Sequence, residues 1–73
     1  MSLREIRLSL EPKVSQEDMA RTANITLQTY RKAEGLKSIK YSTAIAILNV
    51  LNEILKTKGR NQVTLDDLNL TLN

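Results

Sequence analysis

Residues 26–34 include one long amide side chain, Gln28, and two long cationic side chains, Arg31 and Lys32, close together in the sequence. A glutamine amide can pair with adenine through two hydrogen bonds, and an arginine or lysine can donate to O6 and N7 of guanine. At about 100° per residue, Leu27 shares one row of a helix with Arg31, and Gln28 shares the neighbouring row with Lys32. Leu27 has no polar group, so a thymine methyl is its natural partner. Side chains of these types could therefore contact base edges of DNA if a helix presented them on one exposed face.

Each of these side chains also has a simpler interpretation. Leu27 could pack on a neighbouring element, and Arg31 and Lys32 could contact only phosphate. Gln28 is the strongest single candidate for a base contact, because the predicted face and the polarity of its side chain agree.

The positive charge is concentrated in the middle of the chain. The net charge is +3, but residues 21–60 alone carry +6, whereas residues 1–20 carry −1 and residues 61–73 carry −2. Clustered positive charge is typical of a protein that binds a polyanion, although a solvated lysine-rich surface has the same composition.

The loop after the candidate reading helix supplies Lys37, Ser38 and Lys40, and these residues predict phosphate contacts. The alternative is a loop that only improves solubility. A more distant cluster, residues 56–60, contains Lys56, Lys58 and Arg60. We expect these three cations to be solvated.

The composition argues against catalysis. The 73 residues include no Cys and no His, which removes disulfides, thiolate nucleophiles, the commonest general base and the commonest metal ligands. Two glycines cannot form a phosphate-binding loop. We expect a binding protein with no enzymatic activity, no cofactor, no metal and no small-molecule ligand. No apolar run approaches the roughly 18 residues of a membrane span, and the N-terminus lacks a signal-peptide core, so we expect a cytoplasmic protein without membrane contacts.

Start and stop signals divide the chain into helices. Leu3, Ile6 and Leu10 recur at helical spacing over residues 2–10, and Pro12 should end that helix. Ser15 precedes Asp18 in a capping box that predicts a second helix. Asn24, which tolerates the left-handed conformation, should then form the turn.

The third helix should begin at the N-cap Thr26 and run to about Glu34, with Gly35 at C′. Ile25 and Tyr30 are spaced for a hydrophobic staple. Tyr30 and Ala33, three residues apart, should be its buried face. Two short helices joined in this way are typical of a helix-turn-helix unit, here about residues 15–35.

A longer helix is predicted over residues 42–56. Its apolar stripe is Ile45, Leu48, Leu51 and Leu55, widened by Ile47, Val50 and Ile54. Thr64 and Asp67 form another capping box before a short helical turn, and the alternation of Leu68, Leu70 and Leu72 allows a short C-terminal strand. The prediction is one all-α domain, residues 1–73, of about five helices.

Several segments in one order resemble the Cro/cI-type (XRE) helix-turn-helix family, whose pattern is approximately S-Q-E-E-L-A-x-x-x-G-V-S-x-x-T-I-x-x-x-E. The matching residues are Ser15-Gln16-Glu17-Asp18-Met19-Ala20-Arg21, Asn24-Ile25-Thr26, Thr29-Tyr30 and Glu34, together with STAIAI at 42–47 and VTLDDL at 63–68. Departures are Asn24 in place of the turn glycine, and Ala23 and Ala33 in place of larger core residues.

The resemblance implies a small lambda-repressor-like bundle that binds double-stranded DNA as a homodimer and regulates transcription, as a repressor. It implies phosphate contacts from Gln16, with Ser15 and Thr26 beside it at the starts of the two helices. It also implies a structural pair between Arg7 and Glu34, which we expect to be partly exposed and worth about 0.2–1 kcal/mol.

The alternative is a protein-interaction module, such as an antitoxin, that uses the helix-turn-helix as a scaffold. In that case the tail, residues 63–73, would be the docking segment rather than a dimerisation element.

Overall fold

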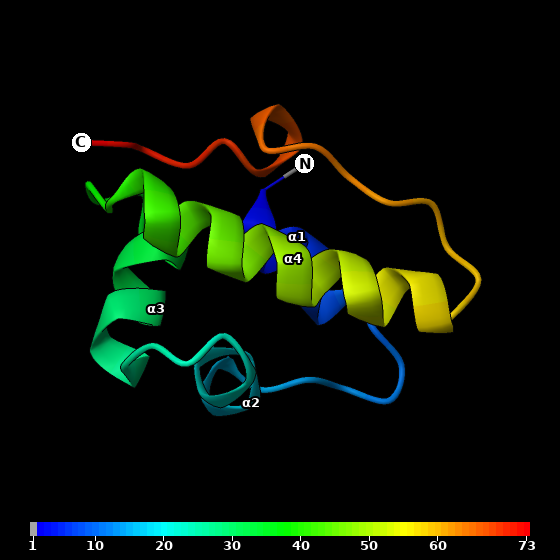
Figure 1. Cartoon of the computed structure of the whole chain (residues 1–73). Helices are drawn as coiled ribbons and strands as arrows, with labels where there is room; N and C mark the ends of the chain where they lie inside the picture. The colour runs from blue at the N-terminus through cyan, green and yellow to red at the C-terminus, as the bar shows by residue number, and fades with distance from the viewer. Residues whose placement is uncertain (1) are drawn as a thin grey trace.

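The computed structural model describes residues 2–73, and within this range the chain forms four α-helices followed by one 3₁₀ turn. The elements are α1 (Leu3–Leu8), α2 (Gln16–Thr22), α3 (Leu27–Glu34), α4 (Tyr41–Thr57) and the 3₁₀ turn η1 (Asp66–Leu68). In Figure 1, α4 crosses the middle of the molecule, with α2 and α3 on one side and the C-terminal segment on the other. The mostly helical fold is confirmed. The fifth helix is not, because the segment after Thr64 makes only a 3₁₀ turn.

Apolar residues from every helix meet in one core. The fully buried side chains are Leu3, Ile6, Leu10, Met19, Ala20, Tyr30, Ala33, Ile39, Ala44, Ile47, Leu51, Leu55 and Leu68. The buried stripe of α4 differs from the predicted one. Ala44 and Ile47 lie in the core, whereas Ile45 and Leu48 are only partly buried at the flank. Alanine contributes little to a hydrophobic pattern, so the sequence did not indicate that Ala44 belongs to the buried stripe of α4.

The helix starts follow the sequence closely. At α2, the backbone N–H of Asp18 donates to Ser15 Oγ at 3.0 Å, and Ser15 N–H donates back to Asp18 Oδ2 at 3.3 Å. Thr64 and Asp67 form the same reciprocal pair before η1. Ser2 and Glu5 form a further capping box at α1 that the sequence analysis had not singled out.

Two helix ends differ from the prediction. α1 ends at Leu8 rather than Leu10, and Ser9 Oγ donates to the Ile6 carbonyl at 2.6 Å. After α3, Gly35 has φ −81°, and the left-handed residue is Leu36 with φ 60°. Asn24, with φ 58°, does take the left-handed conformation predicted for the turn between α2 and α3.

The C-terminal segment folds back onto the α3–α4 loop (Figure 1). Ile39 N–H donates to the Thr71 carbonyl at 3.0 Å, and Asn73 N–H donates to the Ile39 carbonyl at 3.0 Å. Within residues 2–73 this is a single parallel bridge between Ile39 and Leu72 rather than a strand. None of the helices described over these residues is long and apolar enough to cross a membrane.

Candidate nucleic-acid interface

One face of α3 packs on the core, and the opposite face is exposed to solvent. Tyr30 and Ala33 are buried, as predicted, which leaves Gln28, Arg31 and Lys32 exposed. These three side chains and Lys37 line one open hollow of about 340 Å³. Leu27 is only partly exposed and does not line the hollow. Three of the four residues predicted to contact bases therefore share one surface.

A second hollow, of about 310 Å³, adjoins the first through Lys32. Its lining residues are Thr29, Lys32, Ser38, Ile39, Lys40, Thr43 and Asn73. The predicted phosphate contacts Ser38 and Lys40 lie here, and Lys37 lies in the first hollow. Thr29 and Thr43 were missing from the predicted set. The three-residue spacing of Thr29 and Lys32 on α3 was the signal that could have identified Thr29.

Arg7 of α1 and Glu34 at the end of α3 form a bidentate ion pair. Arg7 Nε donates to Glu34 Oε2 at 2.5 Å, and Nη2 donates to Oε1 at 3.2 Å. Arg7 Nη1 also donates to the Val14 carbonyl at 3.0 Å. The two side chains are only 11% and 4% exposed, so the expected partly exposed surface pair is in fact nearly buried. The long side chain of Arg7 reaches under the loop that precedes α2, which a helical pattern alone does not reveal.

Gln16, the first residue of α2, joins this pair to the exposed face of α3. Its Nε2 donates to Glu34 Oε1 at 2.9 Å, and its Oε1 accepts from Arg31 Nε at 3.3 Å. The sequence predicts a phosphate contact for Gln16 and a base contact for Arg31, but not the hydrogen bond between them. The structure places Arg7, Glu34, Gln16 and Arg31 in one chain of hydrogen bonds that spans three helices.

The charge on Glu34 is stabilised by this network. Burial raises the pKa of its carboxyl group, but hydrogen bonds, led by the one from Arg7, outweigh burial and leave the pKa below its usual value. The pKa of Arg7 is raised, chiefly by its hydrogen bond to Glu34. Both groups are therefore held in their charged forms.

Ser15 and Thr26, which are also predicted to contact phosphate, use their side-chain hydroxyls to cap α2 and α3. Ser15 Oγ accepts from the Asp18 backbone, and Thr26 Oγ1 accepts from the Thr29 backbone at 3.1 Å and donates to Thr29 Oγ1 at 2.8 Å. Both residues remain exposed. They stand at the starts of α2 and α3, where backbone N–H groups also point outward.

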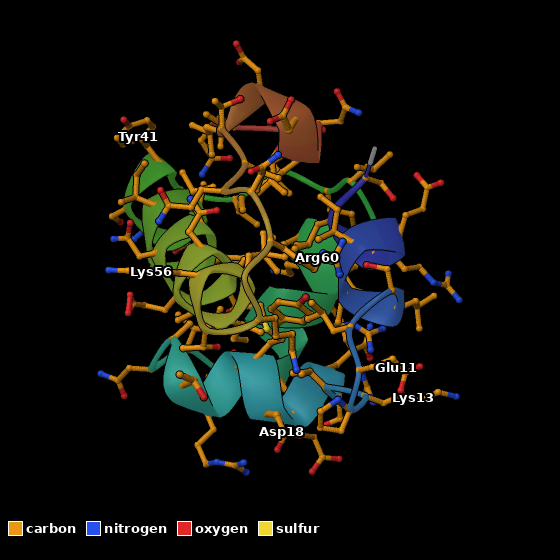
Figure 2. All side chains as sticks on the ribbon, turned by 90° about the vertical axis from the view of Figure 1, so that its right-hand side faces the viewer. Glu11, Lys13, Asp18, Tyr41, Lys56 and Arg60 are labelled. Atoms are coloured by element: carbon orange, nitrogen blue, oxygen red, sulfur yellow. The ribbon has the colours of Figure 1, made fainter. Side chains whose placement is uncertain are left out.

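The last turn of α4 and the residues just after it carry Lys56, Lys58 and Arg60, at the opposite end of the molecule from α3 (Figure 1). Lys58 Nζ donates to the Glu11 carbonyl, and Arg60 Nη1 donates to Ser9 Oγ at 3.1 Å. Figure 2 shows Arg60 directed between α4 and α1, whereas Lys56 points outward. Lys56 and Arg60 are exposed, as predicted, and Lys58 is half-buried. The hydrogen bonds of Lys58 and Arg60, which the sequence did not predict, connect the end of α4 to the segment after α1.

Comparisons of the chain with protein-family models, curated proteins and solved structures found no match.

Proposed function

We propose that this protein is a sequence-specific DNA-binding regulator of transcription that reads the major groove with α3. The observation that carries the proposal is the hollow lined by Gln28, Arg31, Lys32 and Lys37, on the face of α3 opposite the core. Amide and guanidinium groups are the side-chain types that discriminate base edges. A rigid helix that presents them on a cationic surface fits a duplex better than it fits a small ligand.

The remaining residues around α3 would fix the position of the duplex. Lys37, Ser38 and Lys40 stand in the loop that follows α3, and the starts of α2 and α3 offer free N–H groups beside Gln16 and Thr26. Contacts of this kind go to phosphates and carry no sequence information themselves. Together the two sets describe a lambda-repressor-like docking mode for the α2–turn–α3 unit.

The proposal includes a homodimer that binds a pseudo-palindromic operator and acts as a repressor in the cytoplasm. One module contacts too few base pairs to select a site in a genome, and a two-fold dimer doubles the number that are read. Repression is proposed because a small DNA-binding dimer can block a promoter by occupying it, without any further contact.

The test is a gel-shift titration at several salt concentrations, with duplexes selected from a random pool and unselected duplexes. We expect log K to fall steeply with log salt, and one selected site to bind roughly 10³-fold more tightly than random duplexes. Equal binding to selected and random duplexes, or no binding at low salt, would refute the proposed function.

The second candidate is a protein-interaction module of the antitoxin kind. It is favoured by the C-terminal segment, which is held to Ile39 by two backbone hydrogen bonds and leaves Leu72 38% exposed. Tyr41, at the start of α4, is 61% exposed and points away from the bundle (Figure 2). Stable capture of a partner protein that depends on Leu72, together with no DNA binding, would favour this alternative.

A further inference from the structure

We propose that Gln16 is a positioning residue that presents Arg31 to a guanine, so that Gln16 contributes to sequence preference without touching a base. This inference rests on the proposed DNA-binding function. It assigns different roles to the two cations of α3, with Arg31 reading a base and Lys32 contacting the backbone.

The orientation of the Gln16 amide is determined by its partners. A carboxylate only accepts hydrogen bonds and a guanidinium only donates them. The amide nitrogen of Gln16 must therefore face Glu34, at 2.9 Å, and its oxygen must face Arg31 Nε, at 3.3 Å. Glu34 is itself fixed by Arg7, and its side chain is only 4% exposed. Gln16 thus connects the nearly buried ion pair of Arg7 and Glu34 to the exposed side chain of Arg31.

The bond to Gln16 leaves the reading end of Arg31 available. It uses Nε, whereas Nη1 and Nη2 lie at the outer end of the guanidinium and can donate together to O6 and N7 of guanine. Holding Nε also fixes the plane of the guanidinium, and bidentate pairing depends on that plane. The conformational entropy of the Arg31 side chain is then lost when the protein folds, not when DNA binds.

Lys32 lacks this support. Within residues 2–73 its ammonium group has no hydrogen-bond partner, and its side chain lines both hollows, the first together with Lys37 and the second together with Lys40. A flexible point charge among other lysines suits phosphate rather than one base edge.

The experiment measures discrimination at single base pairs. The duplex preferred by the wild-type chain is prepared with every single-pair substitution, and binding is compared for wild type, Gln16→Met, Arg31→Ala and the double variant. We expect Arg31→Ala to abolish a roughly tenfold or greater preference at one G·C pair. Gln16→Met should reduce the preference at that same pair at least about threefold and leave other pairs unchanged. The double variant should resemble Arg31→Ala, because the two residues act as a unit.

Gln62→Met, at an exposed site in the segment after α4, is the matched control and should leave every ratio unchanged. Arg31→Lys is the second variant, because it keeps the charge but replaces the planar guanidinium, including the Nε that Gln16 holds, with a flexible ammonium group. We expect it to weaken the same G·C preference. If Gln16→Met weakens all duplexes equally, Gln16 is a phosphate ligand and the inference is wrong, although the proposed function stands. If the wild type prefers no duplex, the proposed function and the inference fall together.

Discussion

Arg7 and Glu34 connect α1 to the candidate reading helix through side chains that are 11% and 4% exposed. Arg7→Ala would leave the Glu34 carboxylate nearly buried, with Gln16 as its remaining polar donor on α2. We expect the free energy of unfolding to fall by about 1.5–3 kcal/mol, the range for a hydrogen bond to a charged group. Urea denaturation measures this change. Arg21→Ala, which breaks an exposed pair with Asp18, is the control and should have little effect. Equal effects of the two substitutions would contradict the burial argument.

The same pair predicts a pH dependence of stability. The pKa of Glu34 is lowered in the folded state from an ordinary value of 4.5, so the folded chain favours the carboxylate more than the unfolded chain does. The resulting stabilisation is complete above about pH 4.5 and is lost as the pH falls through the lowered folded-state pKa. We therefore expect the stability difference between wild type and Glu34→Gln to be constant from pH 7 to about pH 5 and to narrow below about pH 4.5. Denaturant titrations across this range test the prediction, which a constant difference at every pH would contradict.

Gln28 and Lys40 should affect DNA binding in different ways. Gln28 is exposed on α3 in the first hollow, whereas Lys40 lies in the second hollow just before α4. We expect Gln28→Ala to relax the preference at one A·T pair by roughly 1–3 kcal/mol, and Lys40→Ala to weaken all duplexes about equally and make the salt slope shallower by about one. Binding to a panel of duplexes at three salt concentrations separates these effects. The reverse pattern would show that the groove-facing surface is wrongly assigned.

At the scale of elements, η1 closes the core although it is only a 3₁₀ turn. Leu68 is 0% exposed, whereas Leu72, four residues later, is 38% exposed. We expect Leu68→Ala to destabilise the fold by about 2–5 kcal/mol through the lost burial and the cavity. Leu72→Ala is the matched substitution and should cost much less. Thermal unfolding of both variants makes the comparison, and similar melting temperatures would mean that the C-terminal segment does not contribute to the core.

The features predicted correctly from the sequence are those that neighbouring residues determine. The capping box of Ser15 and Asp18 and the left-handed Asn24 each depend on residues a few positions apart. The burial of Tyr30 and Ala33 was predictable because their three-residue spacing puts both on the face of α3 that packs on the core. Such contacts form in any chain that makes the helix, so a local pattern is sufficient to find them.

The capping box of Ser2 and Glu5 was missed although it is local, but the missed hydrogen bonds that connect separate elements join residues far apart in the chain. Gln16 reaches Arg31 and Glu34 only after α2 has packed against α3, and Arg60 reaches Ser9 only after α4 has returned to α1. In each case a long polar side chain has several possible partners, and the packing of the helices selects one. This is why the exposed positions of α3 could be predicted from the sequence, whereas the hydrogen bonds that connect them to the other helices could not.

At the scale of the whole molecule, the positive charge of residues 21–60 divides between two ends. Arg31, Lys32, Lys37 and Lys40 surround the two hollows beside α3, whereas Lys58 and Arg60 are bound to backbone and side-chain oxygens near α1 at the far end. A single module therefore offers a small cationic face, which limits the number of phosphates it can neutralise. The proposed function therefore includes a homodimer that places two copies of this face on one duplex.

The dimer makes a geometric prediction about the operator. Two reading helices related by a two-fold axis meet successive major grooves on one side of the duplex, so half-sites should lie about 10 base pairs apart, centre to centre. We expect an insertion of about five base pairs between the half-sites to rotate one of them to the opposite side and to reduce the affinity to that of a single half-site. Gel shifts with the intact site, the lengthened site and one half-site make the measurement, and sedimentation at matched concentrations reports the state of the protein. If one half-site binds as tightly as the pair, the chain reads DNA as a monomer and the two-fold arrangement is wrong.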